Sequence, residues 1–319
     1  MSLNEFIFVL GAQDPEMDMI EERIIVPLAL NSEYATINST RVDPSNAYQV
    51  ENKIDESSDK KIVLIECGGE HLSGIKIDHH RPGDPGYGVK AEDFFNASSL
   101  GQMVKFVLSK ASSNQRLFFE LAKKINGEKL SSRTEGNALL YNGTRWIFPN
   151  STAMDIALPS EFIYQAAADH CLAAGYAGKC PGVDKEGLRV LQARNMSKTT
   201  GASLDEVFAS IKKAEALFTT ERERVLGNSS HLVFDLTDLK FGVGYSLGYL
   251  SLKEAGTMLG KPYLVSHRFA ESSPPNVMLN AASEEQVDYF LTTFASKYGL
   301  KKVFGSPSRG YAGGVLPSD

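Results

Sequence analysis

Short apolar runs rich in β-branched residues, alternating with helical stripes, constrain this fold most strongly. Asp14 followed by Pro15 is a typical helix start, and apolar residues from Leu100 to Leu108 recur at helical spacing. The strand-like runs are Phe6–Leu10, Tyr34–Asn38, Lys61–Glu66 and Gly74–Asp78. The order strand, helix, strand, strand, strand, helix predicts an α/β domain with a mostly parallel sheet.

Ligand-type side chains gather where two of these runs end. Three of the six histidines, His71, His79 and His80, fall in this window, and Glu66 and Asp78 lie beside them. Such side chains at the carboxyl ends of adjacent buried strands are what a hard or borderline divalent metal needs. The window therefore predicts a metal site, and an exposed turn with satisfied histidines is the alternative.

Two other places in the chain offer acidic side chains. Asp14 stands at the top of the first strand, where it serves as a helix cap, a metal contact or both. Asp169 and His170 lie on an apolar helix that starts near Glu161. An unpaired buried carboxylate is costly, so this pair either packs the helix or contributes a second set of ligands to the metal site.

The second half of the chain predicts a further, smaller domain. Before it, the runs Ala138–Tyr141 and Arg145–Phe148 indicate a hairpin or an insertion. We expect an α/β domain over residues 1–203, a connecting helix over 204–228 and a small α+β domain over 229–319. The glycine-dense tail around Arg309 is either an anion-binding loop or a flexible terminus.

Composition limits the classes of molecule that the protein is expected to bind. The net charge of −6 disfavours a binder of long nucleic acid. Three cysteines without a disulfide pattern fit a reducing cytosol, and we see neither a signal peptide nor a membrane span. We therefore expect a cytoplasmic protein with a small substrate and no membrane partner, and a homodimer is compatible with this composition.

With these motifs laid out, the chain resembles the DHH phosphoesterase superfamily as a divergent member. The resemblance rests on Ile77 through His80 after a strand, on Ala97 through Leu100 opening the next helix, and on the overall plan. That plan is an α/β domain, a connecting helix and a small C-terminal domain that ends in a glycine-rich loop. The resemblance covers most of the chain.

The resemblance implies a site with one or two divalent metal ions, usually manganese, that activate water and clamp a phosphate. It makes Asp78 a metal ligand with a catalytic role, and it makes His80 the residue that orients or protonates near the phosphate. The implied metal ligands are Asp14, Glu16, Glu66, Asp78, His79 and Asp169. The implied substrate-binding residues are Arg81, Arg268, Arg309, Gly310, Gly313 and Gly314.

The chain departs from the family pattern in its motifs. The first motif reads Asp14-Pro15-Glu16, the second has Glu66 where the family has aspartate, and the last glycine loop has no histidine. A glutamate is one methylene longer than an aspartate, which would disturb a two-metal spacing of about 3.5–4 Å. The site is therefore either rebuilt, with His71 and His170 as additional ligands, or has lost one metal ion.

Three functions follow from these residues. The first is a metal-dependent phosphoesterase, a hydrolase acting on a small phosphorylated or nucleotide substrate in the cleft between the domains. The second is a non-catalytic nucleotide- or phosphate-binding protein on a degenerate version of the same fold. The third is a structural zinc site formed by Cys67, His71 and Cys171, although the chain has no paired Cys-x-x-Cys spacing.

Overall fold

The structure of the protein is a computed structural model. It describes residues 3–44, 46–54, 59–69, 71–111, 115–126, 130–131, 140–141, 146–150, 154–171, 180–221, 223–226, 228–268 and 271–317. The chain forms two compact units: unit 1 comprises Met1–Val89 and Asp93–Asp169, and unit 2 comprises Lys90–Glu92 and His170–Asp319. In these described ranges, no helix combines the length and apolarity needed to cross a membrane.

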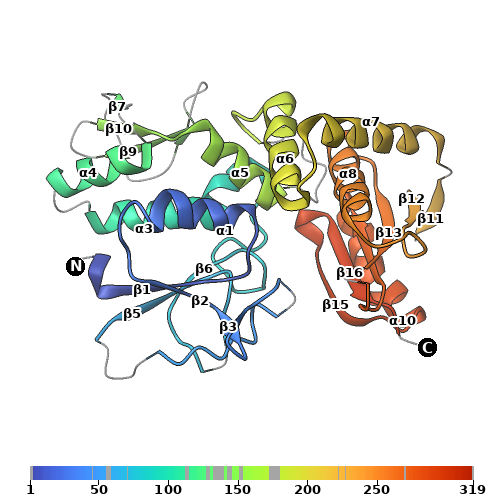
Figure 1. Cartoon of the computed structure of the whole chain (residues 1–319), viewed down its shortest axis with the longest axis horizontal. Helices are drawn as coiled ribbons and strands as arrows, with labels where there is room; N and C mark the ends of the chain where they lie inside the picture. Colours follow the sequence, from blue (N-terminus) through green and yellow to red (C-terminus); the bar gives the residue numbers. More distant parts are fainter. Residues whose placement is uncertain are drawn as a thin grey trace. The chain divides into compact units, whose positions relative to one another are not determined.

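Unit 1 is built on the predicted parallel sheet (Figure 1). Its strands lie in the order β2-β1-β5-β6, and each pairs in parallel with its neighbour. Their bounds are β1 Phe6–Leu10, β2 Ser32–Tyr34, β5 Lys61–Ile65 and β6 Ile75–Ile77. The register pairs Leu10 with Ile65 and Ile65 with Ile77. The carboxyl ends of three strands therefore meet at one edge of the sheet.

Helices α1 (Pro15–Ile20) and α3 (Ser99–Ala111) run along one face of this sheet (Figure 1). The predicted cap is present, since Asp14 Oδ1 accepts a hydrogen bond of 2.7 Å from the amide of Met17. A single π-helical turn, η2 (Glu21–Ile25), continues α1. Alternation along β1 turns Phe6 and Phe8 toward α3, where both rings meet the edge of Phe106. These aromatic contacts fix α3 over the strands.

The other face of the sheet is covered by the loop that follows β4 (Thr40–Arg41). Val9 and Leu64 pack there against Ala47 and Val50 in a buried apolar cluster. Strand β3 (Thr36–Ile37) forms a two-stranded ribbon with β4. This packing buries the loop that holds Tyr48, a residue of the site described below.

The remaining elements of unit 1 follow in chain order. They are η1 (Leu3–Glu5), η3 (Ala91–Asp93), α2 (Phe94–Ala97), α4 (Gln115–Asn126), β7 (Leu130–Ser131), β8 (Leu140–Tyr141), β9 (Trp146–Asn150), β10 (Met154–Ala157) and α5 (Ser160–Cys171). The first two residues of η3 belong to unit 2. Strands β7 to β10 form an antiparallel sheet in the order β7-β10-β9-β8. The pairing of Leu140 with Ile147 confirms the predicted hairpin.

Unit 2 contains a separate six-stranded sheet in the order β11-β12-β13-β14-β16-β15. Only β12 and β13 pair in parallel within it. The strands are β11 (Arg224–Leu226), β12 (Ser229–Asp235), β13 (Tyr263–His267), β14 (Asn276–Asn280), β15 (Lys301–Ser306) and β16 (Tyr311–Val315). The prediction of a two-domain α/β fold with a separate sheet in its second half is therefore confirmed.

Helices cover both faces of the sheet in unit 2. The helices are α6 (Lys185–Thr200), α7 (Leu204–Thr220), α8 (Val243–Leu259), α9 (Glu284–Tyr289), η5 (Phe290–Phe294) and α10 (Ala295–Lys297), with a 3-10 turn η6 (Pro307–Arg309) between β15 and β16. Phe218 of α7 and Leu252 of α8 pack on Phe234 and Tyr263. Phe290 packs on Leu279 from the other side. Helix α7 thus contributes to the core of unit 2, and its role as a connecting helix stays a prediction.

Two features of unit 2 differ from expectation. Helix α6 was not predicted because its sequence lacks a clear apolar stripe, yet Asp184 caps its start and Gly201, with φ of 74°, ends it. The glycine-dense tail is not a flexible terminus: it forms the end of β15, the η6 turn with Arg309 and Gly310, and β16, and its anion-binding role stays a prediction. A Cβ on Gly313 would lie 2.4 Å from the Met278 sulfur. The glycine therefore serves close packing within the sheet.

Candidate metal centre

Glu66 and His79 lie just beyond neighbouring strands at the carboxyl edge of the parallel sheet. The amide of Glu66 donates a 3.0 Å hydrogen bond to the carbonyl of Ile77, which ties the end of β5 to β6. Glu66 has a φ of +50°, a conformation that a residue with a Cβ adopts only when its surroundings impose it. Backbone strain of this kind clusters at functional sites. It turns the Glu66 side chain toward the edge of the sheet.

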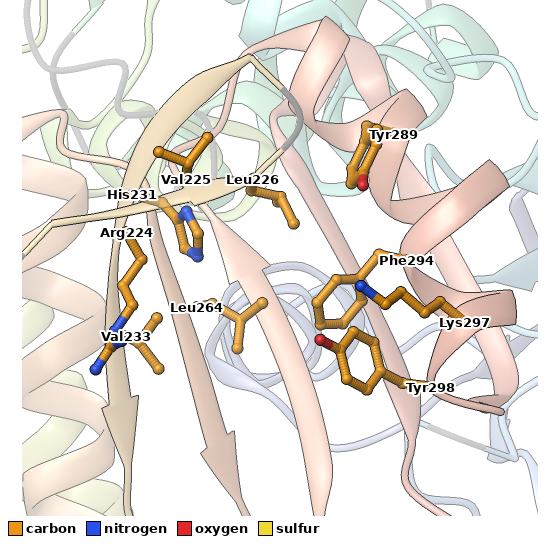
Figure 2. Close-up of a pocket in the computed structure, with 10 residues that line it drawn as sticks. All are labelled: Arg224, Val225, Leu226, His231, Val233, Leu264, Tyr289, Phe294, Lys297 and Tyr298. Atoms are coloured by element: carbon orange, nitrogen blue, oxygen red, sulfur yellow. The ribbon is translucent and has the colours of Figure 1, made fainter.

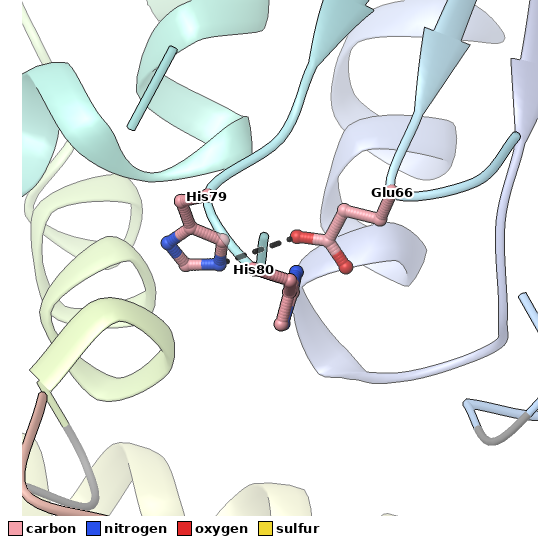
Figure 3. A group of neighbouring side chains, drawn as sticks. All are labelled: Glu66, His79 and His80. Carbon is pink, nitrogen blue, oxygen red and sulfur yellow. Dashed lines mark ion pairs between the residues drawn. The ribbon is translucent and has the colours of Figure 1, made fainter. Parts of the chain in front are cut away.

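The side chains of Glu66, His79 and His80 converge at this edge (Figure 3). His79 Nε2 lies 3.6 Å from Glu66 Oε1 and 2.7 Å from Asp169 Oδ2. The His79 side chain is fully buried, and that of Asp169 is 20% exposed. Two acidic residues far apart in the chain therefore face one buried imidazole.

Asp169 reaches this point from α5, which is held against unit 1 at its opposite end. Arg23 of η2 forms an ion pair with Glu161 in the first turn of α5. The same guanidinium lies 5.7 Å from the ring centroid of Phe162. Both contacts fix the start of α5, and the helix carries Asp169 to His79.

Glu16 brings a third carboxylate from α1. Its side chain is buried, and Oε1 accepts a hydrogen bond of 2.9 Å from the amide of Leu100 at the start of α3. Oε2 is buried and has no hydrogen-bond partner among the described residues, and the same holds for Oε1 of Glu66. Buried carboxylate oxygens without donors are costly unless a cation faces them.

These side chains form two overlapping sets of ligand atoms. One atom from each of Glu16, Glu66, His79 and Asp169 lies within 4.8 Å of the other three, and Glu66, His79 and His80 form a second such set. Glu66 and His79 belong to both sets. Three carboxylates with imidazole suit manganese or another hard-to-borderline divalent ion. The donor set thus fits a divalent metal ion.

The crowded acids hold their protons more tightly than free ones. Burial raises the pKa of Glu66 to about 8, partly opposed by His80 and reinforced by Asp14. Burial and then the charge of Asp169 raise the pKa of Glu16 well above its usual range. The same two causes raise the pKa of Asp14 to about 6. A divalent cation would reverse this preference by stabilising the ionised forms.

Asp78 orients the histidines through its own hydrogen bonds. Its Oδ1 lies 2.9 Å from His80 Nδ1 and accepts from the amides of His79 and His80 at 2.7 and 3.0 Å. Its Oδ2 accepts from the hydroxyl of Tyr48 at 2.8 Å. Burial opposes ionisation, but the hydrogen bonds from His80 and Tyr48 outweigh it and lower the pKa of Asp78. An ionised Asp78 fixes the His80 proton on Nδ1.

Two residues of this network were missed in the sequence. The Tyr48 hydroxyl holds Asp78, and the Arg81 guanidinium lies 3.2 Å from the centroid of the Tyr48 ring. Gln102 of α3 donates to the carbonyl of Asp78 at 3.0 Å and accepts from its amide at 3.3 Å. The apolar interruption at Tyr48 in a polar segment was the available signal. Gln102 gave none, because a polar residue on a helix is ordinary.

The other predicted metal ligands lie outside the two ligand sets. Asp14 and Asp78 cap α1 and the histidine turn, and their role as ligands stays a prediction. His71 is exposed, with Nε2 3.1 Å from the carbonyl of Asn52. His170 is buried in unit 2, and its carbonyl accepts from Arg309 Nε at 3.1 Å. Within the described residues, neither histidine joins a ligand set.

The predicted substrate-binding residues of the second half lie in unit 2. Arg309 is buried beside the Tyr311 ring, and the amide of Arg268 donates to the hydroxyl of Tyr245. Gly310 ends the η6 turn with a φ of 68°, and Gly313 and Gly314 lie within β16. Their role in substrate binding stays a prediction.

The proposed structural zinc site gains no geometric support. Cys67 is buried, its thiol donates to the carbonyl of Val9 at 3.4 Å, and burial raises its pKa to about 12. A zinc-ligating cysteine is normally a thiolate. The side chain of Cys171 lies outside the described residues. Cys67 and His71 belong to neither ligand set of the described chain.

Comparison with known proteins gives little beyond this geometry. No family model matches the chain, and no curated protein matches it. Among solved structures the chain is similar to a pGpG-specific phosphodiesterase, PggH, from Vibrio cholerae, at 12% sequence identity and a TM-score of 0.30. The match covers 98% of this chain and 93% of that chain. At this level of similarity, the function must be argued from the residues of the site.

Proposed function

We propose that the protein is a metal-dependent phosphoesterase that hydrolyses a small phosphorylated or nucleotide substrate. The observation that carries the proposal is the convergence of Glu16, Glu66, His79 and Asp169 around one point in unit 1, with two buried carboxylate oxygens that have no donor among the described residues. A divalent cation, manganese by preference, balances these charges. The family resemblance to DHH phosphoesterases belongs to the same proposal.

The overlap of the two ligand sets supports room for one or two ions. Glu66 and His79 are shared, Glu16 and Asp169 complete one set, and His80 completes the other. When bound, divalent cations polarise a phosphoryl oxygen and make water a stronger nucleophile. An anionic pocket without a cation would repel a phosphate instead. The acidic donor set therefore favours phosphate binding and hydrolysis only when a divalent cation is bound.

The chain supplies proton transfer through His80. Its Nδ1–H donates to Asp78, so the lone pair of Nε2 is available to accept or return a proton at a substrate oxygen. The His80 side chain is 33% exposed, whereas His79 is fully buried. This difference assigns His79 to the cation and, with a single ion bound in the set of Glu16, Glu66, His79 and Asp169, leaves His80 to the substrate. The neighbouring exposed Arg81 is the candidate for binding a phosphate oxygen.

Metal-dependent melting and turnover test the proposal together. Purified protein, stripped with a chelator and reloaded with manganese, is assayed on bis(p-nitrophenyl) phosphate, p-nitrophenyl phosphate and a short dinucleotide. We expect manganese to raise the melting temperature and to be required for turnover. His79→Asn should abolish the manganese-dependent shift, whereas His80→Asn should retain it and lose about 10²–10⁴-fold in kcat. The control Glu92→Gln changes an exposed carboxyl and should behave like wild type.

The outcomes separate the competing functions. A manganese-dependent shift with no turnover on any substrate, combined with stabilisation by a nucleotide, would support the non-catalytic binding protein instead. No shift with manganese, magnesium, iron or zinc would remove the metal centre and both phosphate functions that depend on it. Equal turnover by wild type and His79→Asn would exclude this site as the source of activity.

A further inference from the structure

A pocket opens on the sheet of unit 2, separate in its residues from the metal centre. Its volume is about 380 Å³, within the range of small-molecule sites. One wall comes from β11, β12 and β13, and the other from the end of α9, η5, α10 and the residue after α10 (Figure 2). All of its lining residues lie in unit 2.

The strand wall of the pocket is apolar. Leu226, Val233 and Leu264 line it, and the ring of Phe294 faces them from the helical wall. Val225 at the rim is 75% exposed. Leu226 and Leu264 are buried in the core cluster that Phe290 completes, so the floor of the pocket is part of a rigid core. Such a surface gains free energy when an apolar body covers it.

Polar groups reach into the pocket from the helical wall. The ammonium of Lys297 and the hydroxyl of Tyr298 point toward the strands, and the hydroxyl of Tyr289 points toward Lys297 (Figure 2). Arg224 places a second cation on the strand side. Among the described residues, no carboxylate lines the pocket. Its polar groups therefore favour an anion.

His231 adds a buried polar atom to the strand wall of the pocket. The residue is 6% exposed, and its Nδ1 is buried with no hydrogen-bond partner among the described residues. Burial lowers the pKa of His231, and a hydrogen bond with the backbone of Arg224 opposes that shift only in part. In the neutral imidazole, Nδ1 either donates or accepts one hydrogen bond, depending on the tautomer. A buried ring nitrogen of this kind normally has a partner.

We propose that this pocket binds a small amphipathic monoanion, a carboxylic acid with an aromatic or aliphatic body. The carboxylate would contact Lys297, Tyr289 and Tyr298, and the body would lie on Leu226, Leu264 and Phe294. Lys297 is the one cation of the helical wall among the lining residues, and Arg224 lies on the strand side, so a single carboxylate on the helical wall fits better than the multiple charges of a nucleotide.

Calorimetric titration with matched ligands tests this proposal on the full chain. 4-Phenylbutyrate is compared with 4-phenylbutan-1-ol, which has the same body without the charge, and with adenosine monophosphate. We expect the acid to bind at least about tenfold more tightly than the alcohol or the nucleotide. Lys297→Glu should weaken binding of the acid by about tenfold or more. The control Lys301→Glu reverses an exposed charge outside the pocket and should leave binding unchanged.

A second variant guards against a folding artefact. Val225→Glu places a carboxylate on an exposed side chain at the rim, where the fold does not depend on it, and it should also weaken the acid about tenfold. Melting curves confirm that all variants are folded. Equal binding of acid and alcohol, no binding of the acid at millimolar concentration, or wild-type affinity in Lys297→Glu would each overturn the proposal. Tighter binding of adenosine monophosphate would assign the pocket to nucleotides and overturn it as well.

Discussion

At the scale of single residues, the candidate metal centre is a cluster of acids in a buried setting. Glu66 combines a positive φ, a buried carboxylate oxygen without a donor and a shared place in both ligand sets. The positive φ and the carboxylate oxygen without a donor each lower the stability of the metal-free protein. A ligand that neutralises the cluster offsets them, because it binds the folded form alone. The free energy of unfolding of the metal-free protein should therefore rise when a carboxylate of the cluster is neutralised.

Glu66→Gln should stabilise the metal-free protein and abolish its response to metal. At pH 7 a carboxyl with a folded pKa near 8 must take up a proton on folding, whereas the unfolded carboxyl is ionised. The amide avoids that uptake, so the free energy of unfolding should rise by about 1 to 3 kcal/mol. Urea denaturation with and without manganese measures both effects. Glu92→Gln, an exposed match, should change neither. A lower stability of metal-free Glu66→Gln would contradict the account.

Tyr48→Phe tests how Asp78 is held. The substitution removes one hydrogen bond to Asp78 and leaves the ring under Arg81, so stability should fall by about 0.5 to 1.5 kcal/mol. The pKa of Asp78 should rise because a hydrogen bond to its ionised form is lost. Activity should then be lost at a higher pH than in wild type as the solution is acidified, with the manganese-dependent shift intact. An unchanged acid limb of the pH–rate profile would remove Tyr48 from the positioning of His80.

At the scale of elements, close packing at the start of α3 seats Glu16. A Cβ on Gly101 would lie 1.6 Å from the carbonyl oxygen of Phe95, a distance that requires the backbone to move. Gly101→Ala should therefore destabilise unit 1 by about 1 to 3 kcal/mol or more. Its movement should also weaken the manganese response, because Leu100 holds Glu16. Chemical denaturation and metal titration measure the two consequences.

A helical glycine in open space provides the contrast. Gly248 lies inside α8, and no atom beyond its own helix stands within 4 Å of a Cβ built there. Gly248→Ala should stabilise the protein by about 0.5 to 1 kcal/mol, because alanine loses less backbone freedom on folding. If both substitutions shifted stability in the same direction, the packing argument for Gly101 would fail.

The elements also show what the sequence was able to predict. Local signals predicted β1, the Asp14 cap of α1 and the core stripe of α3, because each depends on neighbouring residues. Helix α6 was not predicted, because capping residues without an apolar stripe are weak evidence for a helix. Strand β16 was not predicted, because glycines that serve sheet packing look like glycines that serve a loop.

The candidate site was predictable only in part, for a related physical reason. Glu66 and His79 follow strands in sequence, and parallel pairing brings strand ends together. Nothing local places Glu16 beside Asp169, since their contact depends on how α1 and α5 pack. Tyr48 and Gln102 reach Asp78 only through tertiary structure. Sequence patterns therefore indicate the donor types and leave the network that orients them to the fold.

At the scale of the whole molecule, the two units carry separate sources of pH sensitivity. The acids of the metal centre belong to unit 1, and Glu254 on α8 belongs to unit 2. Glu254 is 2% exposed, and its Oε1 has no hydrogen-bond partner among the described residues. Burial raises its pKa to about 8, with Arg189 and Lys253 lowering it and Glu215 raising it. A group of this kind affects stability without touching metal or substrate.

Glu254 should make the protein less stable as the pH rises. Its folded pKa is raised from 4.5 to about 8, so between these values the folded chain binds more protons than the unfolded chain. The free energy of unfolding then falls as pH increases through that window. Its contribution is complete below the unfolded pKa and is lost above the folded one. Each pKa unit between the folded and the unfolded carboxyl corresponds to about 1.4 kcal/mol of unfolding free energy.

Glu254→Gln separates this contribution from all others in the molecule. The amide does not titrate, so the difference in unfolding free energy between the variant and wild type should grow from pH 5 to pH 9, with the variant gaining. Urea denaturation of the chelated proteins at pH 5, 7 and 9 measures that difference and keeps metal binding out of it. Glu271→Gln, an exposed carboxyl of the same unit, should give a difference that is flat with pH. A flat difference for Glu254→Gln as well would mean that the Glu254 carboxyl is ionised in the folded protein. Arg189, which pairs with Glu215 and whose charge lowers the pKa of Glu254, would then be the cation that compensates the ionised carboxylate.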